Sequence, residues 1–102
     1  MVEVRWSEQA LEDLDAICLF IARDAPMAAR MFCGKAFDAT DKLEIMPRMG
    51  PVVPEYENEA IRELFMGNYR LIYHYDQDLG IVEILTMHHG ARILKLEPPE
   101  QG

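Results

Sequence analysis

Two strand-like runs joined by a Gly-Asn dipeptide constrain the fold of this chain more than any other part of its sequence. The runs span residues 61–66 and 69–76 and carry the β-branched and aromatic side chains typical of strands. A two-residue Gly-Asn connection predicts a β-hairpin, because both residues tolerate the positive φ of primed turns. The turn fixes the register, and side chains alternate between faces, so Arg62 and Arg70 are expected on opposite faces.

A second hairpin is expected because residues 77–80 separate this strand from another alternating run at 81–88. A four-residue loop pairs His74 with Glu83 and completes a three-stranded antiparallel meander. One face collects apolar side chains and is predicted to face the core: Leu64, Met66, Leu71, Tyr73, Val82 and Ile84. The other face is mixed, which is typical of an open or partner-covered surface: Phe65, Ile72, Leu85 and Met87 beside Glu63, Arg70, His74 and Glu83.

The first half of the chain predicts a strand followed by two helices. Residues 2–6 alternate as in a short strand, and Ser7 is a suitable N-cap for a helix over residues 8–23. Pro26 begins a second helix that runs to about Met46 and packs on the first through a band of small and apolar residues. Several acidic residues are expected to face solvent: Glu8, Glu12, Asp13 and Asp15 on the first helix, and Glu55, Glu57 and Glu59 in the loop that follows Pro47.

The predicted fold class is therefore α+β: an N-terminal strand, a helical hairpin and a three-stranded antiparallel meander. With 102 residues, half of them hydrophobic, and no linker or repeat, the chain is expected to form one domain over residues 1–102. It has neither a run of about 18 apolar residues nor a charged-then-apolar leader, so we expect no membrane span and a cytoplasmic location. Cys18 and Cys33 match no metal-ligand spacing and are expected to be buried reduced thiols rather than a disulfide or redox pair. We expect no metal and no cofactor.

The charge distribution restricts where an anion could bind. The net charge of −8 argues against broad attraction to nucleic acid, which needs lysine and arginine to displace phosphate counterions. Residues 1–66 hold 13 acidic and 7 basic residues, whereas residues 67–96 hold 3 acidic residues, 3 basic residues and all three histidines. A site that faces an anion is therefore predicted in the second of these segments.

Two arginines of the hairpin are the first candidate site residues. Arg62 and Arg70 could bind a phosphate or a carboxylate of a partner, because guanidinium groups bind both bidentately. The alternative is a structural ion pair, such as Arg70 with Glu63 on the neighbouring strand, which if partly exposed would contribute under about 1 kcal/mol. The residues alone leave both interpretations open.

The end of the last strand supplies the other candidates, His88, His89 and Arg92. Two imidazoles and a guanidinium at this place could transfer a proton or contact a phosphate. Neighbouring residues on a strand point to opposite faces, so at most one of the two histidines can share a site with Arg70. For the same reason a metal site built on the His-His pair is not expected.

Taken in order, eight segments of the chain resemble the RelE/ParE superfamily of bacterial toxins from toxin–antitoxin systems, and its ParE branch in particular. The segments are residues 4–7 (VRWS), 10–14 (ALEDL), 24–29 (DAPMAA), 47–50 (PRMG), 62–64 (REL), 67–73 (GNYRLIY), 82–85 (VEIL) and 88–92 (HHGAR). The resemblance implies a helical hairpin packed on a mainly antiparallel sheet. It also implies a cognate antitoxin whose extended C-terminal segment wraps around the toxin in a hetero-oligomer.

The superfamily divides by target, and the resemblance implies two possible activities. Nuclease members cut messenger RNA on the ribosome, and resemblance to them would make Arg70 and either His88 or His89 catalytic. The lysines expected just before the hairpin turn are missing, since Ile61 and Glu63 occupy the neighbouring positions. Resemblance to the ParE branch implies inhibition of DNA gyrase by binding, with Arg62, Arg70 and Arg92 as target-binding candidates. The net charge favours this second activity.

Overall fold

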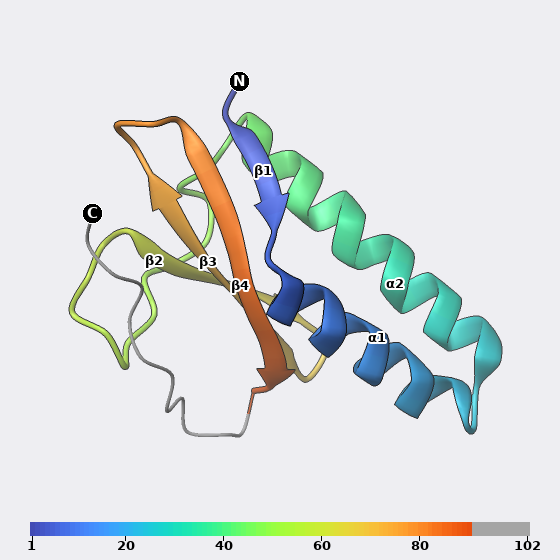
Figure 1. Ribbon diagram of the computed structural model, residues 1–102. Coiled ribbons are helices and arrows are strands. Elements are labelled where there is room, and N and C mark those ends of the chain that lie inside the picture. Colours follow the sequence, from blue (N-terminus) through green and yellow to red (C-terminus); the bar gives the residue numbers. More distant parts are fainter. Residues whose placement is uncertain (91–102) are drawn as a thin grey trace.

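The computed structural model describes residues 1–90 and has the α+β architecture that the sequence predicts (Figure 1). The elements in chain order are β1 (Glu3–Trp6), α1 (Glu8–Ala22), α2 (Pro26–Asp41), the short 3-10 helix η1 (Lys42–Glu44), β2 (Ile61–Met66), β3 (Tyr69–Asp76) and β4 (Ile81–His89). Ser7 caps α1 as predicted, because its hydroxyl accepts a hydrogen bond from the Ala10 amide at 3.0 Å. None of the helices in this part of the chain is long and apolar enough to cross a membrane.

The four strands form one sheet in the order β1-β4-β3-β2. The meander is antiparallel, and β1 joins its β4 edge in parallel, so β1 and β2 are the two outer strands. The helices α1 and α2 lie side by side on one face of this sheet (Figure 1). The main core lies between the helices and the sheet and consists of Ala10, Leu14, Ile17, Ala36, Leu43, Met66, Leu71, Tyr73, Val82, Ile84 and Met87.

The register of the first hairpin is confirmed along its whole length. Phe65 pairs with Arg70 and Arg62 with Tyr73, as the two-residue turn requires. Gly67 has a φ of 58°, and no non-glycine residue among those described has a positive φ. A positive φ at the first turn position alone is the pattern of a type II′ turn. Gly67 is thus the residue that the turn needs, and Asn68 needs no left-handed conformation.

The second hairpin follows the predicted register only as far as a β-bulge. His74 pairs with Glu83 and Tyr73 with Ile84, but Ile72 pairs with Thr86. The additional residue in β4 reverses the alternation beyond this point. Met87 consequently lies opposite Leu71 and is buried in the main core, so its predicted place on the mixed face is wrong.

Asp13 of α1 is bonded to the strand beyond this bulge. Its carboxylate accepts hydrogen bonds from the Thr86 hydroxyl and, at 3.1 Å, from the Met87 amide. The expectation that Asp13 faces solvent is therefore wrong, because the bulge brings these two donors under the helix. This contact fixes α1 on β4.

The face of the sheet opposite the helices is partly closed by the chain itself. Val53, Ile61 and Ile72 form a second, smaller core, with Tyr56 and Leu85 packed at its side. The loop over residues 45–60 supplies Val53 and Tyr56 and crosses this face beside β2. The prediction of an open or partner-covered face holds for Phe65, which is 63% exposed, but not for Ile72, Glu63 or Arg70, which are buried.

Candidate functional site

Arg70 lies on the loop-covered face of the sheet between two carboxylates. Its Nε donates a hydrogen bond to Glu63 Oε1 at 2.6 Å, while Nη1 and Nη2 donate to the two oxygens of Glu55 at 2.6 and 2.8 Å. The Arg70 side chain is only 6% exposed. Hydrogen bonds to Glu55 are the main reason why the pKa of Arg70 is raised above its usual range. The structure thus contains the Arg70–Glu63 ion pair. Glu55 lies in an exposed turn as expected, but its carboxylate also pairs with Arg70, which the sequence did not predict.

Arg62 also binds the loop, but through main-chain oxygens. Its Nη1 donates to the carbonyl oxygens of Gly50 at 2.9 Å and Arg48 at 3.2 Å, and its Nε donates to that of Glu59 at 3.0 Å. The two arginines therefore attach the same loop from opposite faces of the hairpin, as the alternation along the strands predicts. A role for either arginine in target binding stays a prediction.

Tyr73 fixes the start of this loop from within the core. Its hydroxyl donates to the Pro47 carbonyl at 2.9 Å and accepts from the Gly50 amide at 3.1 Å. Burial raises the pKa of Tyr73, so the phenol remains a hydrogen-bond donor near neutral pH. The loop is thus held on β2 and β3 by one phenol and two guanidinium groups.

The histidines at the end of β4 are divided between the two faces. His88 pairs with Arg70, and His89 pairs with Tyr69, whose ring meets the His89 ring edge-on at 5.7 Å between centroids. The His88 Nδ1 lies 3.0 Å from the His89 carbonyl oxygen, and its buried Nε2 has no hydrogen-bond partner within residues 1–90. The structure therefore brings only His88 to the Arg70 side. Arg92 lies outside the described residues.

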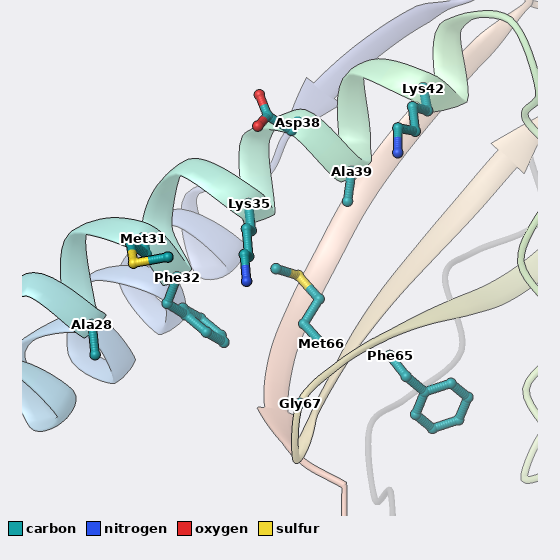
Figure 2. Close-up of a pocket in the computed structure, with 10 residues that line it drawn as sticks. All are labelled: Ala28, Met31, Phe32, Lys35, Asp38, Ala39, Lys42, Phe65, Met66 and Gly67. Atoms are coloured by element: carbon teal, nitrogen blue, oxygen red, sulfur yellow. The ribbon is translucent and has the colours of Figure 1, made fainter.

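A groove of about 670 Å³ lies between α2 and the C-terminal end of β2 (Figure 2). Its lining is apolar with two lysines and one acid: Ala28, Met31, Phe32, Lys35, Asp38, Ala39, Lys42, Phe65, Met66 and Gly67. In Figure 2, Lys35 extends from α2 towards Met66, while Phe65 points away from the helix. This groove was not predicted from the sequence, although one helix face can be traced at three- and four-residue spacing through Ala28, Met31, Phe32, Lys35, Ala39 and Lys42.

The strand that borders the groove is paired on its outer side only at its beginning. The Val53 amide donates to the Ile61 carbonyl, and the Glu63 amide donates to the Pro51 carbonyl, each at 3.0 Å. Within residues 1–90, no segment continues this pairing to Phe65. In a strand, alternate residues direct their backbone N–H and C=O to the same side. The N–H and C=O of Phe65 therefore point outward, as those of Ile61 and Glu63 do, at the end of β2 that borders the groove. Such an edge can accept an added strand.

An antiparallel meander with a parallel N-terminal strand and a helical hairpin on one face is the fold of the RelE/ParE toxins. The chromosomal ParDE system of Pseudomonas aeruginosa contains a chain of this fold with a TM-score of 0.71 and 20% identity, covering 87% of this chain and 96% of that one. The isolated RelE toxin of Escherichia coli aligns with a TM-score of 0.60 and 14% identity, covering 91% and 88% of the two chains. At these identities the likeness shows the fold alone.

The sequence itself identifies the family. The chain belongs to the family described as the ParE toxin of the type II toxin–antitoxin system parDE, whose profile matches residues 4–94. It is also 32% identical over 93 residues to the toxin RelE2 of Caulobacter vibrioides, a match that covers 91% of this chain and all of that protein. The protein is thus a type II toxin of the RelE/ParE superfamily.

Proposed function

We propose that this toxin inhibits DNA gyrase by binding it, without catalysis, and that a cognate antitoxin neutralises it. The observation that carries this proposal is the enclosure of Arg70 by Glu55 and Glu63. Arg70 is the residue that a ribosome-dependent nuclease of this superfamily would direct at the RNA phosphate. Here the positive charge of Arg70 is already paired with two carboxylates of the protein itself. Since gyrase acts on chromosomal DNA, the proposal places the toxin in the cytoplasm.

Electrostatics support binding over RNA cleavage. One guanidinium and two carboxylates give the Arg70 cluster a formal charge of −1. Stabilising a phosphoryl transition state requires positive charge or hydrogen-bond donors directed at the oxygens that gain charge. A phosphate would have to displace Glu55 and then lie beside Glu63, in a protein whose net charge is −8. That arrangement opposes the reaction rather than promoting it.

One observation favours the alternative, a ribosome-dependent mRNA nuclease. His88 lies opposite Arg70, and its buried Nε2 lacks a hydrogen-bond partner among the described residues. The His88 imidazole is therefore a candidate general acid. His89 is the second candidate and is less well placed, because its side chain lies on the face of the sheet opposite Arg70.

Replacing His88 by alanine separates the two activities. For a gyrase-binding toxin we expect growth inhibition and inhibition of DNA supercoiling to stay within a few-fold of the parent. For a nuclease that uses His88 as its acid, cleavage of mRNA on programmed ribosomes would fall about 10²- to 10⁴-fold with ribosome binding intact. The matched control is His74→Ala, which changes the third histidine, opposite Glu83 on the same sheet. A large loss of mRNA cleavage in His88→Ala alone would contradict the gyrase proposal.

The groove beside α2 is the part of the molecule that best fits the antitoxin. Two of the solved structures are toxin–antitoxin assemblies: the ParDE system of Pseudomonas aeruginosa and the RelBE2 complex of Mycobacterium tuberculosis. A chain of the RelBE2 complex aligns with a TM-score of 0.61 and 23% identity, covering 86% of this chain and 96% of that one. In this chain the groove offers apolar contacts, two lysines in a protein of net charge −8, and the outer edge of β2 at Phe65, which no segment within residues 1–90 pairs. We infer that it binds an apolar segment of the antitoxin that also carries acidic side chains.

Charge reversal at the two groove lysines tests this inference. We expect Lys35→Glu combined with Lys42→Glu to weaken antitoxin binding by about tenfold or more, mainly through slower association and with a smaller salt dependence. The control has the same change in net charge away from the groove, Arg5→Glu combined with Arg23→Glu. Surface plasmon resonance at two salt concentrations measures both effects. Equal losses in the two double variants would show that only the overall charge matters.

A further inference from the structure

The end of the Arg70 guanidinium is closed by one side chain of the loop. Glu63 holds the guanidinium from the sheet, since its Oε1 accepts from Nε and also lies 2.6 Å from Nη2. Glu55 binds the end of the fork and accepts from Nη1 and Nη2 with its two oxygens, at 2.6 and 2.8 Å. Paired N–H···O bonds of this kind are how guanidinium groups bind the carboxylate or phosphate of another molecule. Glu55 therefore occupies the position that an external anion would take.

The two carboxylates differ in how firmly they are fixed. The Glu63 side chain belongs to β2 and is 5% exposed, whereas the Glu55 side chain is 25% exposed and belongs to an exposed residue of the turn. In that turn the Tyr56 amide donates to the Val53 carbonyl at 3.2 Å, a bond that does not involve the Glu55 side chain. Rotation of one side chain into solvent therefore uncovers the fork, while Glu63 keeps the arginine in place.

We propose that Arg70 is a gated carboxylate-binding site, in which Glu55 is an internal ligand that an acidic side chain of the target protein displaces. The external carboxylate is assigned to the target on the strength of the proposed binding to DNA gyrase. No atom is transferred, because one carboxylate replaces another on the same two N–H groups. Since Glu55 must leave first, the apparent affinity for the target is reduced by the fraction of molecules in which the fork is open.

Charge favours a carboxylate over a phosphate as the external ligand. Exchange of one carboxylate for another leaves the formal charge of the cluster at −1. A phosphate monoester carries about −1.5 to −2 at pH 7 and would add negative charge beside Glu63. A nucleic-acid strand would bring several phosphates close to a protein whose net charge is −8. The site thus fits a single acidic side chain of a protein.

Chemical rescue of Glu55→Ala tests the site without gyrase or antitoxin. The variant keeps the Arg70–Glu63 pair, so we expect it to fold with an uncovered fork. Acetate that replaces chloride at constant ionic strength should bind there and raise the melting temperature. The expected rise is about 4–8 °C once acetate reaches about five times its dissociation constant. The parent and Glu57→Ala, which changes an exposed acid of the same turn, should show no such rise.

Several results of this titration would overturn the proposal. An equal rise in Glu57→Ala would show a general effect of the salt. No rise in a folded Glu55→Ala would show that the fork binds no external carboxylate, and failure of this variant to fold would make Glu55 a structural residue. A larger rise with phosphate than with acetate at the same ionic strength would assign the site to phosphates instead.

Inhibition of gyrase supercoiling tests the assignment to the target. Glu55→Gln keeps the size of the side chain but removes its charge, so the fork should be open in more molecules. We expect half-inhibition at about three- to tenfold lower toxin concentration than with Glu57→Gln, which has the same change in net charge. An equal or higher concentration would overturn the assignment to the target. If the parent does not inhibit gyrase, the proposed function fails, and the acetate titration still decides whether Arg70 binds a carboxylate.

Discussion

Arg70→Ala is expected to lower the free energy of unfolding by about 3–5 kcal/mol, because it leaves the buried Glu63 carboxylate without its cation and also removes the partner of Glu55. Glu63 is 4% exposed, and Glu55 is held over the sheet by the same guanidinium. For a domain of this size the loss corresponds to a fall in melting temperature of more than about 10 °C. Differential scanning calorimetry and urea titration measure it.

The control for this prediction is another arginine with an acidic partner. Arg5 pairs with Glu3 on the surface of β1, and its side chain is 58% exposed. We expect Arg5→Ala to change the unfolding free energy by less than about 1 kcal/mol, since exposed ion pairs contribute little. If Arg70→Ala were as mild as Arg5→Ala, the cluster around Arg70 would not hold the loop.

This expectation changes how an Arg70 variant must be interpreted. Loss of toxicity in Arg70→Ala would follow from unfolding alone and would not show that Arg70 touches a target. A triple variant, Arg70→Met with Glu55→Gln and Glu63→Gln, removes all three charges and should recover much of the stability. If this triple variant is folded and still toxic, Arg70 is not a target-binding residue. If it is folded and harmless, the prediction of a target contact gains direct support.

Gly50→Ala is expected to destabilise the fold by about 1–3 kcal/mol or more through steric overlap. A Cβ atom at this position would lie 2.3 Å from the Glu63 carbonyl oxygen and 2.9 Å from the Tyr73 hydroxyl. The first of these is backbone of the edge strand, which cannot rotate away. The overlap would push the loop off β2 and disturb the hydrogen bonds of Tyr73 and Arg62 together. Urea denaturation and amide exchange in residues 47–63 would reveal both effects.

Gly34→Ala is the matched control for Gly50→Ala. Gly34 lies within α2, and an added Cβ atom would meet nothing within 4 Å. Alanine has the higher helix propensity, so this change should raise stability by up to about 1 kcal/mol. Opposite signs for the same substitution would show that close approach of the loop to β2, rather than loss of glycine itself, causes the damage. A neutral Gly50→Ala would contradict the packing at the loop.

Local chemistry was sufficient to predict most of the elements. The Gly-Asn turn determined the register of β2 and β3 because a two-residue connection leaves no freedom for strands to slide. Ser7 and Pro26 marked the starts of both helices because capping and the missing proline N–H act within one turn. Alternation also placed His88 and His89 on different faces, so the site prediction that only one histidine can lie near Arg70 agrees with the structure.

The sequence by itself therefore determined which segments become helices and strands, how the first hairpin pairs, and which side chains share a face within each strand. Only the tertiary structure decided where the bulge falls, that the loop over residues 45–60 partly closes one face, and that Glu55 reaches Arg70. The first group depends on residues a few positions apart, whose geometry the backbone dictates. The second depends on contacts between residues distant along the chain, which arise only when a buried guanidinium, phenol or carboxylate must find a partner in the packed fold.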